Sequence, residues 1–158
     1  MLQRIQTVFL ILVVLFMMGS LIFPIWISKA PETDIFYRLF SFYFETIDAT
    51  SDTQSSTKLF FPYTFIGICA IASIATAIFE ITRFKNRLLQ MKLSALNSLF
   101  MAATLGISVY YGTGMVKEYA GGYGLGLFLP GAAMICNILA NRYIRRDERL
   151  VKSVDRIR

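Results

Sequence analysis

Six polar side chains lie inside otherwise apolar stretches of the chain, and these residues are the best placed to do chemistry. They are Thr76, Glu80, Asn97, Ser98, Asn137 and Asn141. Polar groups surrounded by hydrocarbon need partners, so we expect the six to face one another in one layer. One interpretation is a polar pocket with Glu80 as its titratable group. The other, which we favour, is a set of interhelical hydrogen bonds worth about 0.6–2 kcal/mol each, with Glu80 paired to Arg83.

The sequence lacks the motifs that mark most catalytic and metal chemistry. The sequence has no histidine, and it shows none of the short motifs of hydrolases, zinc proteases, phosphate-binding loops or redox pairs. The two cysteines, Cys69 and Cys136, lie well inside apolar runs and fit small buried side chains better than a reactive pair. We therefore expect no enzyme activity, no metal and no cofactor.

Four apolar runs must position these polar side chains. They cover about residues 7–28, 59–82, 93–114 and 119–141. Each is near the ~20 residues that cross ~30 Å of hydrocarbon. Charged residues make up 16% of the 158, below the roughly 25% of a soluble domain. The sequence predicts an all-α integral membrane four-helix bundle, a single domain over residues 1–158.

The charges between the runs predict an orientation. Residues 29–58 form a loop with three basic and five acidic residues, whereas residues 83–92 carry four basic residues and no acid. The tail 142–158 has seven basic and three acidic residues. Basic segments stay in the cytoplasm, so both termini are expected inside, with loop 29–58 outside. Aromatic residues such as Trp26 and Tyr111 fall at the expected outer boundary.

The outer loop has a periodic segment. Between residues 33 and 48, polar and aromatic side chains recur at steps of three and four, which is typical of a helix. We expect an amphipathic helix there, lying either on the outer leaflet or against the bundle. A β-strand interpretation of Ser41–Phe44 remains open.

The fourth run is rich in glycine. The residues concerned are Gly122, Gly124, Gly126 and Gly131. Small residues let helix backbones approach closely, and Gly122 and Gly126 have the spacing of a packing pair. Tight packing within the bundle is the interpretation we favour, and contact with a partner subunit is the alternative.

The C-terminal segment is expected to continue the fourth helix into the cytoplasm as a basic, amphipathic tail. Its cations are Arg142, Arg145, Arg146, Arg149, Lys152, Arg156 and Arg158. Three roles fit them: a solvated anchor, binding of anionic lipid headgroups, or contact with a protein or ribosomal RNA. We expect no DNA partner.

The two ends of the chain resemble the domain of unknown function 4293 family of small bacterial inner-membrane proteins. The resemblance rests on the start MLQRIQTVFLIL and the close ILANRYIRRDERLVKSVDRIR. The matching tail positions are Asn141, Arg142, Arg145, Asp147, Glu148, Ser153, Asp155 and Arg156. The resemblance implies four helices, a variable outer loop and a charged helical tail, and it implies no activity.

Three functions follow from these features. We favour a non-enzymatic accessory or assembly subunit of a complex in the bacterial inner membrane, bound to other membrane subunits or to copies of itself. A small oligomeric transporter or lipid-binding membrane protein, working through the polar layer around Glu80, is the alternative. An enzyme acting on lipid is the third and least supported.

Overall fold

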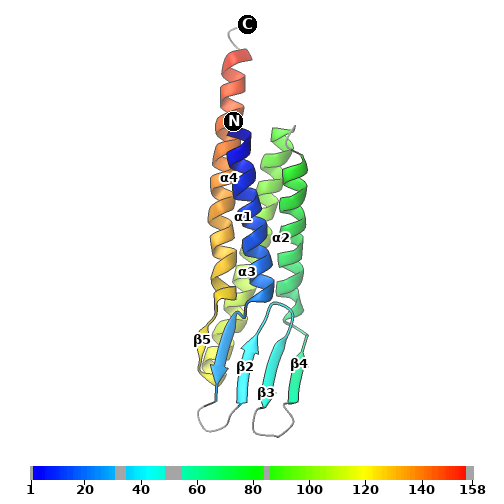
Figure 1. Ribbon diagram of the computed structural model, residues 1–158, viewed down its shortest axis with the longest axis vertical. Coiled ribbons are helices and arrows are strands. Elements are labelled where there is room, and N and C mark those ends of the chain that lie inside the picture. The colour runs from blue at the N-terminus through cyan, green and yellow to red at the C-terminus, as the bar shows by residue number, and fades with distance from the viewer. Residues whose placement is uncertain (1, 31–34, 49–54, 84–85, 156–158) are drawn as a thin grey trace.

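Four helices form a bundle with a small β-sheet at one end (Figure 1). The computed structural model describes residues 2–30, 35–48, 55–83 and 86–155, with side chains for residues 5–30, 35–48, 55–83 and 86–149. The helices are α1 (Leu2–Ile22), α2 (Thr64–Thr82), α3 (Arg87–Tyr119) and α4 (Leu125–Asp155). α1 and α3 each pack against both α2 and α4, so the helices form a ring. The N- and C-terminal ends lie together, opposite the sheet; we call this the terminal end.

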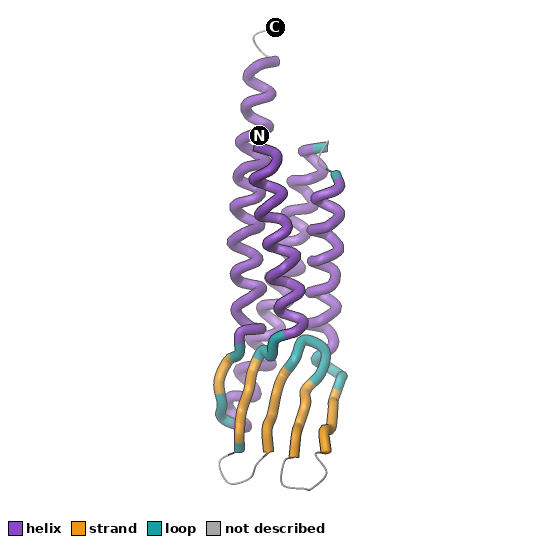
Figure 2. Tube along the Cα trace, viewed as in Figure 1, coloured by secondary structure: helices purple, strands orange, loops and turns teal. Residues whose placement is uncertain are grey.

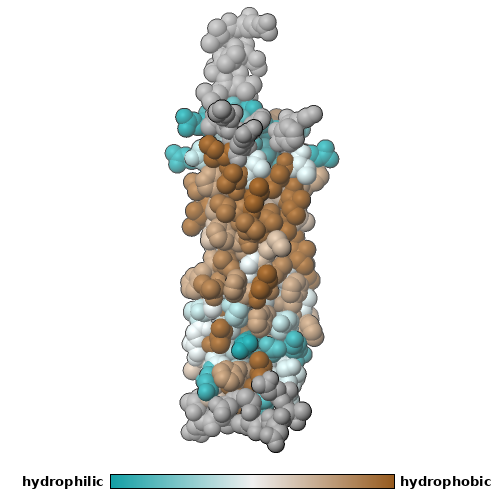
Figure 3. All heavy atoms as spheres, viewed as in Figure 1, coloured by the Kyte–Doolittle hydropathy of each residue, from teal (hydrophilic) through white to brown (hydrophobic). Residues whose placement is uncertain are grey.

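The outer surface of the bundle is apolar. All four helices are long and apolar enough to cross a membrane, and Figure 3 shows a hydrophobic band between two more hydrophilic ends. On α1, for example, Val8, Ile11 and Leu15 are exposed around a helix that has no charged residue from Ile5 to Ile22. Exposing so much apolar surface is unfavourable in water but favourable in lipid. The prediction of four membrane-spanning helices is thus supported, and the fold indicates a membrane protein.

The sheet is antiparallel throughout, in the order β4-β3-β2-β1-β5 (Figure 2). Its strands are β1 (Trp26–Lys29), β2 (Ile35–Leu39), β3 (Phe44–Asp48), β4 (Ser55–Leu59) and β5 (Gly122–Tyr123). The first four come from the loop between α1 and α2. The fifth comes from the connection between α3 and α4, so that segments a hundred residues apart share one sheet.

The expected amphipathic helix over 33–48 is therefore wrong, and the fold is not all-α. Residues 35–48 form the β2–β3 hairpin, and residues 33 and 34 lie outside the described residues. The amide of Phe40 donates to the carbonyl of Tyr43 at 2.9 Å, which closes a two-residue turn at Ser41 and Phe42. Aromatic and β-branched residues favour strands, and pairing with β1 and β4 decides the outcome.

The tip of this hairpin seats between α1 and α2. The Ser41 hydroxyl donates to the carbonyl of Ser20 on α1 at 2.6 Å, and the Gly67 amide on α2 donates to the carbonyl of Ser41 at 2.8 Å. The ring of Phe42 lies directly against Gly67, where any side chain would overlap it. The absence of a side chain at Gly67 therefore lets the hairpin tip pack closely against α2.

One face of the sheet packs on the last turns of α3, which extend beyond the other helices (Figure 1). The buried residues of this junction include Trp26, Leu39, Tyr63 and Met115, with Tyr119 packed against them. The predicted third run stopped at residue 114, but Lys117 and Glu118 belong to α3. Burial against the sheet explains the extra length of the helix.

The helix boundaries near the sheet also differ from the expected ones. The first run was expected to reach residue 28, but α1 ends at Ile22, since proline disfavours helical geometry at the residue before it and Pro24 follows. α4 begins at Leu125 instead of 119, because Ala120 and Gly121 adopt positive φ angles of 55° and 96° that end α3. Trp26 and Tyr123 therefore lie in strands.

Candidate functional site

The interior of the bundle contains buried polar side chains beside a core of apolar ones. On α3 the buried face carries Gln90, Ser94, Asn97, Thr104 and Ser108. These positions follow one another at steps of three, four or seven, so they form a single stripe along the helix. Gln90, Ser94 and Asn97 bond other helices, whereas the hydroxyls of Thr104 and Ser108 donate to backbone carbonyls of α3 itself.

Asn137 joins α4 to α3 through three hydrogen bonds. Its Nδ2 donates to the carbonyl of Ser94 at 2.9 Å and to the Ser98 hydroxyl at 2.8 Å, and its Oδ1 accepts from the Ser94 hydroxyl at 3.3 Å. Asn137 is almost fully buried. An amide whose donors and acceptor are all used is a structural crosslink between the two helices.

A second polar contact joins α2 to α3. The Ser73 hydroxyl donates to Oδ1 of Asn97 at 2.5 Å, and both side chains are fully buried. The Nδ2 of Asn97 has no hydrogen-bond partner among the described residues. Asn97 therefore keeps an unused donor in the interior of the bundle.

Glu80 is fully buried on α2, and neither of its carboxyl oxygens has a hydrogen-bond partner in the part of the chain that the structure describes. The nearest polar contact is to its backbone: Nε2 of Gln90 donates to the Glu80 carbonyl at 3.3 Å, while Oε1 of Gln90 is unpaired. Arg83, which we expected to pair with Glu80, instead lies over the ring of Phe79 at 5.0 Å. Glu80 is therefore the most costly polar group inside the bundle.

The six predicted polar residues thus do not share one network. Ser98 and Asn137 bond each other and Asn97 bonds Ser73, whereas the carboxyl of Glu80 has no hydrogen-bond partner among the described residues. The Thr76 hydroxyl donates to the carbonyl of Ala72 on its own helix at 2.7 Å. Asn141 lines a groove at the terminal end, and its buried Oδ1 has no hydrogen-bond partner in the described ranges.

Three residues that complete these contacts were not among the predicted ones: Ser73, Ser94 and Gln90. The signal that could have revealed Gln90 and Ser94 is their spacing with Asn97, which places the three on one face of α3. No comparable signal marks Ser73, since serine in an apolar helix often bonds its own backbone.

The four glycines have different environments. A Cβ added at Gly124 or Gly126 would overlap the backbone of Pro24, and at Gly126 also that of Phe23, whereas one added at Gly122 or Gly131 would meet no described atom within 4 Å. The expected helical pair of Gly122 and Gly126 is wrong, because Gly122 belongs to β5. The close packing at the other two glycines is within this chain.

The basic tail continues α4, which extends to Asp155. Arg142, Arg145, Arg146 and Arg149 line the groove that Asn141 also borders. Near it, Arg87 on α3 forms an ion pair with Asp147 on α4 at 2.8 Å. The side chain of Lys152, and the residues Arg156 and Arg158, lie outside the described residues.

The same chain can be compared with known families. A family described as a domain of unknown function (DUF4293) matches residues 2–157, nearly the whole length. The chain belongs to this family. No curated protein matches it. The resemblance seen in its two ends is therefore confirmed, and because DUF4293 carries no assigned activity, function must be argued from the residues themselves.

Two substitutions in this DUF4293 protein test whether hydrogen-bonded polar side chains stabilise the bundle more than unpaired ones do. Asn137→Leu removes three hydrogen bonds and should lower the free energy of unfolding by about 2 kcal/mol, at ~0.6 kcal/mol or more per bond. Glu80→Gln, which keeps the shape and removes an unpartnered carboxyl, should leave stability unchanged or raise it. Unfolding by denaturing detergent, followed by circular dichroism, measures both. A clear loss with Glu80→Gln would mean that the carboxyl has a stabilising partner.

Proposed function

We propose that this protein is a non-enzymatic accessory or assembly subunit of a protein complex in the bacterial inner membrane. In this proposal both termini are cytoplasmic and the sheet lies on the outer side. The distribution of basic residues supports the orientation: Arg83, Arg87, Lys92 and the arginines of α4 from Arg142 onward gather at the terminal end. Cations in short segments beside membrane helices are retained in the cytoplasm.

The observation that carries the proposal is the free edge of β4. All five residues of this strand are exposed, and its outer side has no strand partner among the described residues. Ladder bonds alternate between the two sides of an antiparallel strand, and the Phe40–Tyr43 bond fixes their phase. Ser56 and Lys58 therefore direct their backbone groups outward. An open edge of this kind is a template for a strand of another chain.

The edge lacks the usual protection. Proteins often block such edges with lysine, and Lys58 is the candidate here. Its ammonium, however, lies 3.6 Å from the Glu45 carboxylate and 4.8 Å from the ring centre of Tyr43. It is held over Glu45 of β3 and over Tyr43 just before that strand, not across the edge. Beyond it, Leu59, Phe60 and Phe61 are exposed apolar side chains that extend the same surface. A partner strand could thus gain backbone bonds and apolar contacts together.

Ser56→Pro should release the protein from its complex. Proline removes the outward amide of Ser56 and keeps the bonds between β3 and β4, so the fold should persist while strand docking is lost. Size-exclusion chromatography with mass measurement, after extraction in mild detergent, should show the complex for the natural protein and a monomer for the variant. Ser56→Ala keeps the amide and should keep the complex. A natural protein that is always monomeric, or a Ser56→Pro protein that stays assembled, would contradict the proposal.

Glu80 favours a second candidate function, a small transporter or a lipid-binding protein that works through the polar interior. A buried carboxyl without a partner costs stability, and such residues inside membranes are often functional. The variant Glu80→Gln separates the two candidates. If the protein is an accessory subunit, the variant should assemble as the natural protein does. If it works through the carboxyl, the variant should lose the growth or transport that depends on this group.

A further inference from the structure

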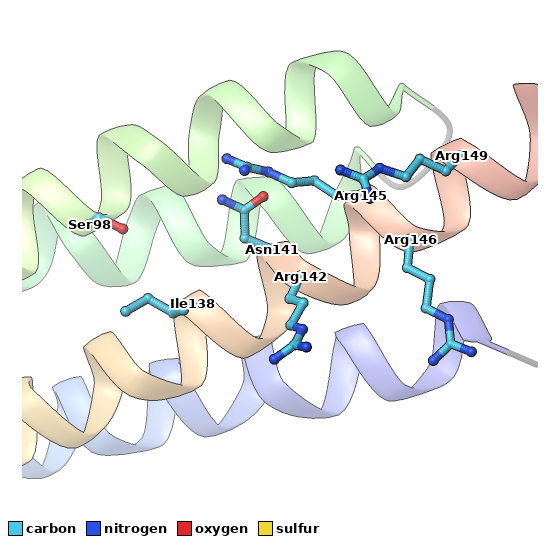
Figure 4. Close-up of a pocket in the computed structure, with 7 residues that line it drawn as sticks. All are labelled: Ser98, Ile138, Asn141, Arg142, Arg145, Arg146 and Arg149. Atoms are coloured by element: carbon cyan, nitrogen blue, oxygen red, sulfur yellow. The ribbon is translucent and has the colours of Figure 1, made fainter.

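A basic groove runs between α3 and α4 at the terminal end (Figure 4). It has a volume of about 970 Å³, the size of a site for a substantial ligand. Arg142, Arg145, Arg146 and Arg149 border it, together with Asn141, Ser98 and Ile138. No acidic residue is found among the described residues that line it. The groove is therefore a concentration of positive charge with no acidic residue in its described lining.

Two of these arginines are aimed along the groove. In Figure 4 the side chain of Arg145 runs back over Asn141 toward Ser98, and Arg149 leans the same way. Side chains on a helix tilt toward its N-terminus, and the N-terminus of α4 is at the sheet end. The guanidinium groups are thus directed toward the apolar band, although free arginines at a membrane surface extend toward water. No ion pair is found for either one in the described part of the chain. Both side chains are exposed, so an anion that enters the groove can reach them.

The depth of the groove indicates what kind of anion fits. From Arg149 to Ile138 it extends about 16 Å along α4, at 1.5 Å per residue. At its deep end, beside Ser98, the apolar side chain of Ile138 is exposed next to the hydrophobic surface of the bundle. A phosphate with an attached hydrocarbon chain matches both ends, whereas a free phosphate would leave the apolar end unfilled. One guanidinium group can bind two phosphate oxygens at once, so a phosphate suits a site with neighbouring arginines.

The third polar feature is Asn141, whose Oδ1 is buried and lacks a donor among the described residues. That oxygen is closed off from the groove, so Asn141 contributes to the polar wall beside the arginines and does not accept from a ligand. An anionic phospholipid headgroup, as in phosphatidylglycerol, places its phosphate oxygens at the arginines. We infer that the groove between α3 and α4 is a binding site for one anionic phospholipid, with its phosphate at Arg145 and Arg149 and an acyl chain along Ile138.

Native mass spectrometry of the full-length protein can test this inference. The protein is stripped of lipid in detergent and given phosphatidylglycerol or phosphatidylcholine with identical acyl chains. We expect one phosphatidylglycerol retained per chain and no phosphatidylcholine. The double variant Arg145→Gln/Arg149→Gln should weaken retention about thirtyfold, since each cation near anionic lipid contributes roughly a factor of five.

A matched control removes two cations from the same end of the bundle. Arg83 and Lys92 lie outside the lining of the groove, so Arg83→Gln/Lys92→Gln should retain the lipid. Asn141→Asp leaves every arginine in place and adds a negative charge to the groove, and it should also lose the lipid. Equal losses in the two double variants would overturn the inference in favour of diffuse attraction. Displacement of the lipid by millimolar inorganic phosphate would overturn the lipid as the natural occupant.

Discussion

Gly126→Ala should destabilise the protein by about 3 kcal/mol, at the upper end of the cost of overpacking. The Gly126 amide donates to the carbonyl of Pro24 at 3.0 Å, and the α-carbon lies against the backbone carbonyl of Phe23. An added methyl group would overlap both carbonyl oxygens. Since these are backbone atoms, no side chain can rotate away, and the end of α1 must separate from the start of α4.

Gly131→Ala is the matched control for this experiment. Gly131 lies on the same helix, and a methyl group added there would meet no described atom within 4 Å outside its own turn of helix. Alanine is favoured over glycine within a helix by up to about 1 kcal/mol, so this variant should be neutral or stabilised. Unfolding in denaturing detergent compares the two variants directly. Equal effects would mean that the close contact between α1 and α4 does not exist.

Trp26→Ala should cost about 3–5 kcal/mol, the usual range for emptying a large aromatic site. Trp26 is 0% exposed on β1, and its ring centre lies 6.4 Å from that of Tyr119 on α3. It is the largest fully buried side chain in the described structure. Its loss should detach the sheet from α3 first, because this residue fills the core that joins them.

Ile27→Ala provides the comparison, since Ile27 is the next residue on β1 and its side chain is 41% exposed. Its replacement should cost less than about 1 kcal/mol. Trp26 is the only tryptophan in the chain, so circular dichroism, not tryptophan fluorescence, should follow unfolding. Limited proteolysis between α1 and α2 should become faster for Trp26→Ala alone. Similar protease resistance in both variants would contradict a core built on this ring.

The four helices could be predicted because lipid imposes a simple rule: about 20 apolar residues must cross the hydrocarbon. The sheet could not. Between residues 35 and 48, the aromatic residues recur at intervals that suit both a helix and a hairpin, and the choice depends on pairing with β1 and β4. The contribution of Gly122 and Tyr123 as a fifth strand depends on a turn at Ala120 and Gly121 that periodicity does not reveal.

The candidate site was predictable in the types of residue it uses but not in their partners. Asparagines in apolar runs must find hydrogen bonds, and Asn97 and Asn137 do. Which hydroxyl each one meets depends on how far one helix slides along another, a quantity that no single sequence contains. The structure therefore replaces one expected layer with separate contacts at Ser73 and Ser94.

The anchoring of the hairpin tip by Ser20 and Gly67 has a mechanical consequence. At that end all four helices lead directly into strands of one sheet, so the bundle is clamped there. Helices that are joined at one end can move apart most at the other, so the separation between helices should be largest at the terminal end. There the Arg87–Asp147 ion pair is what bridges α3 and α4. Because these helix ends are farthest from the sheet, a molecule that enters between the two helices should do so most easily there.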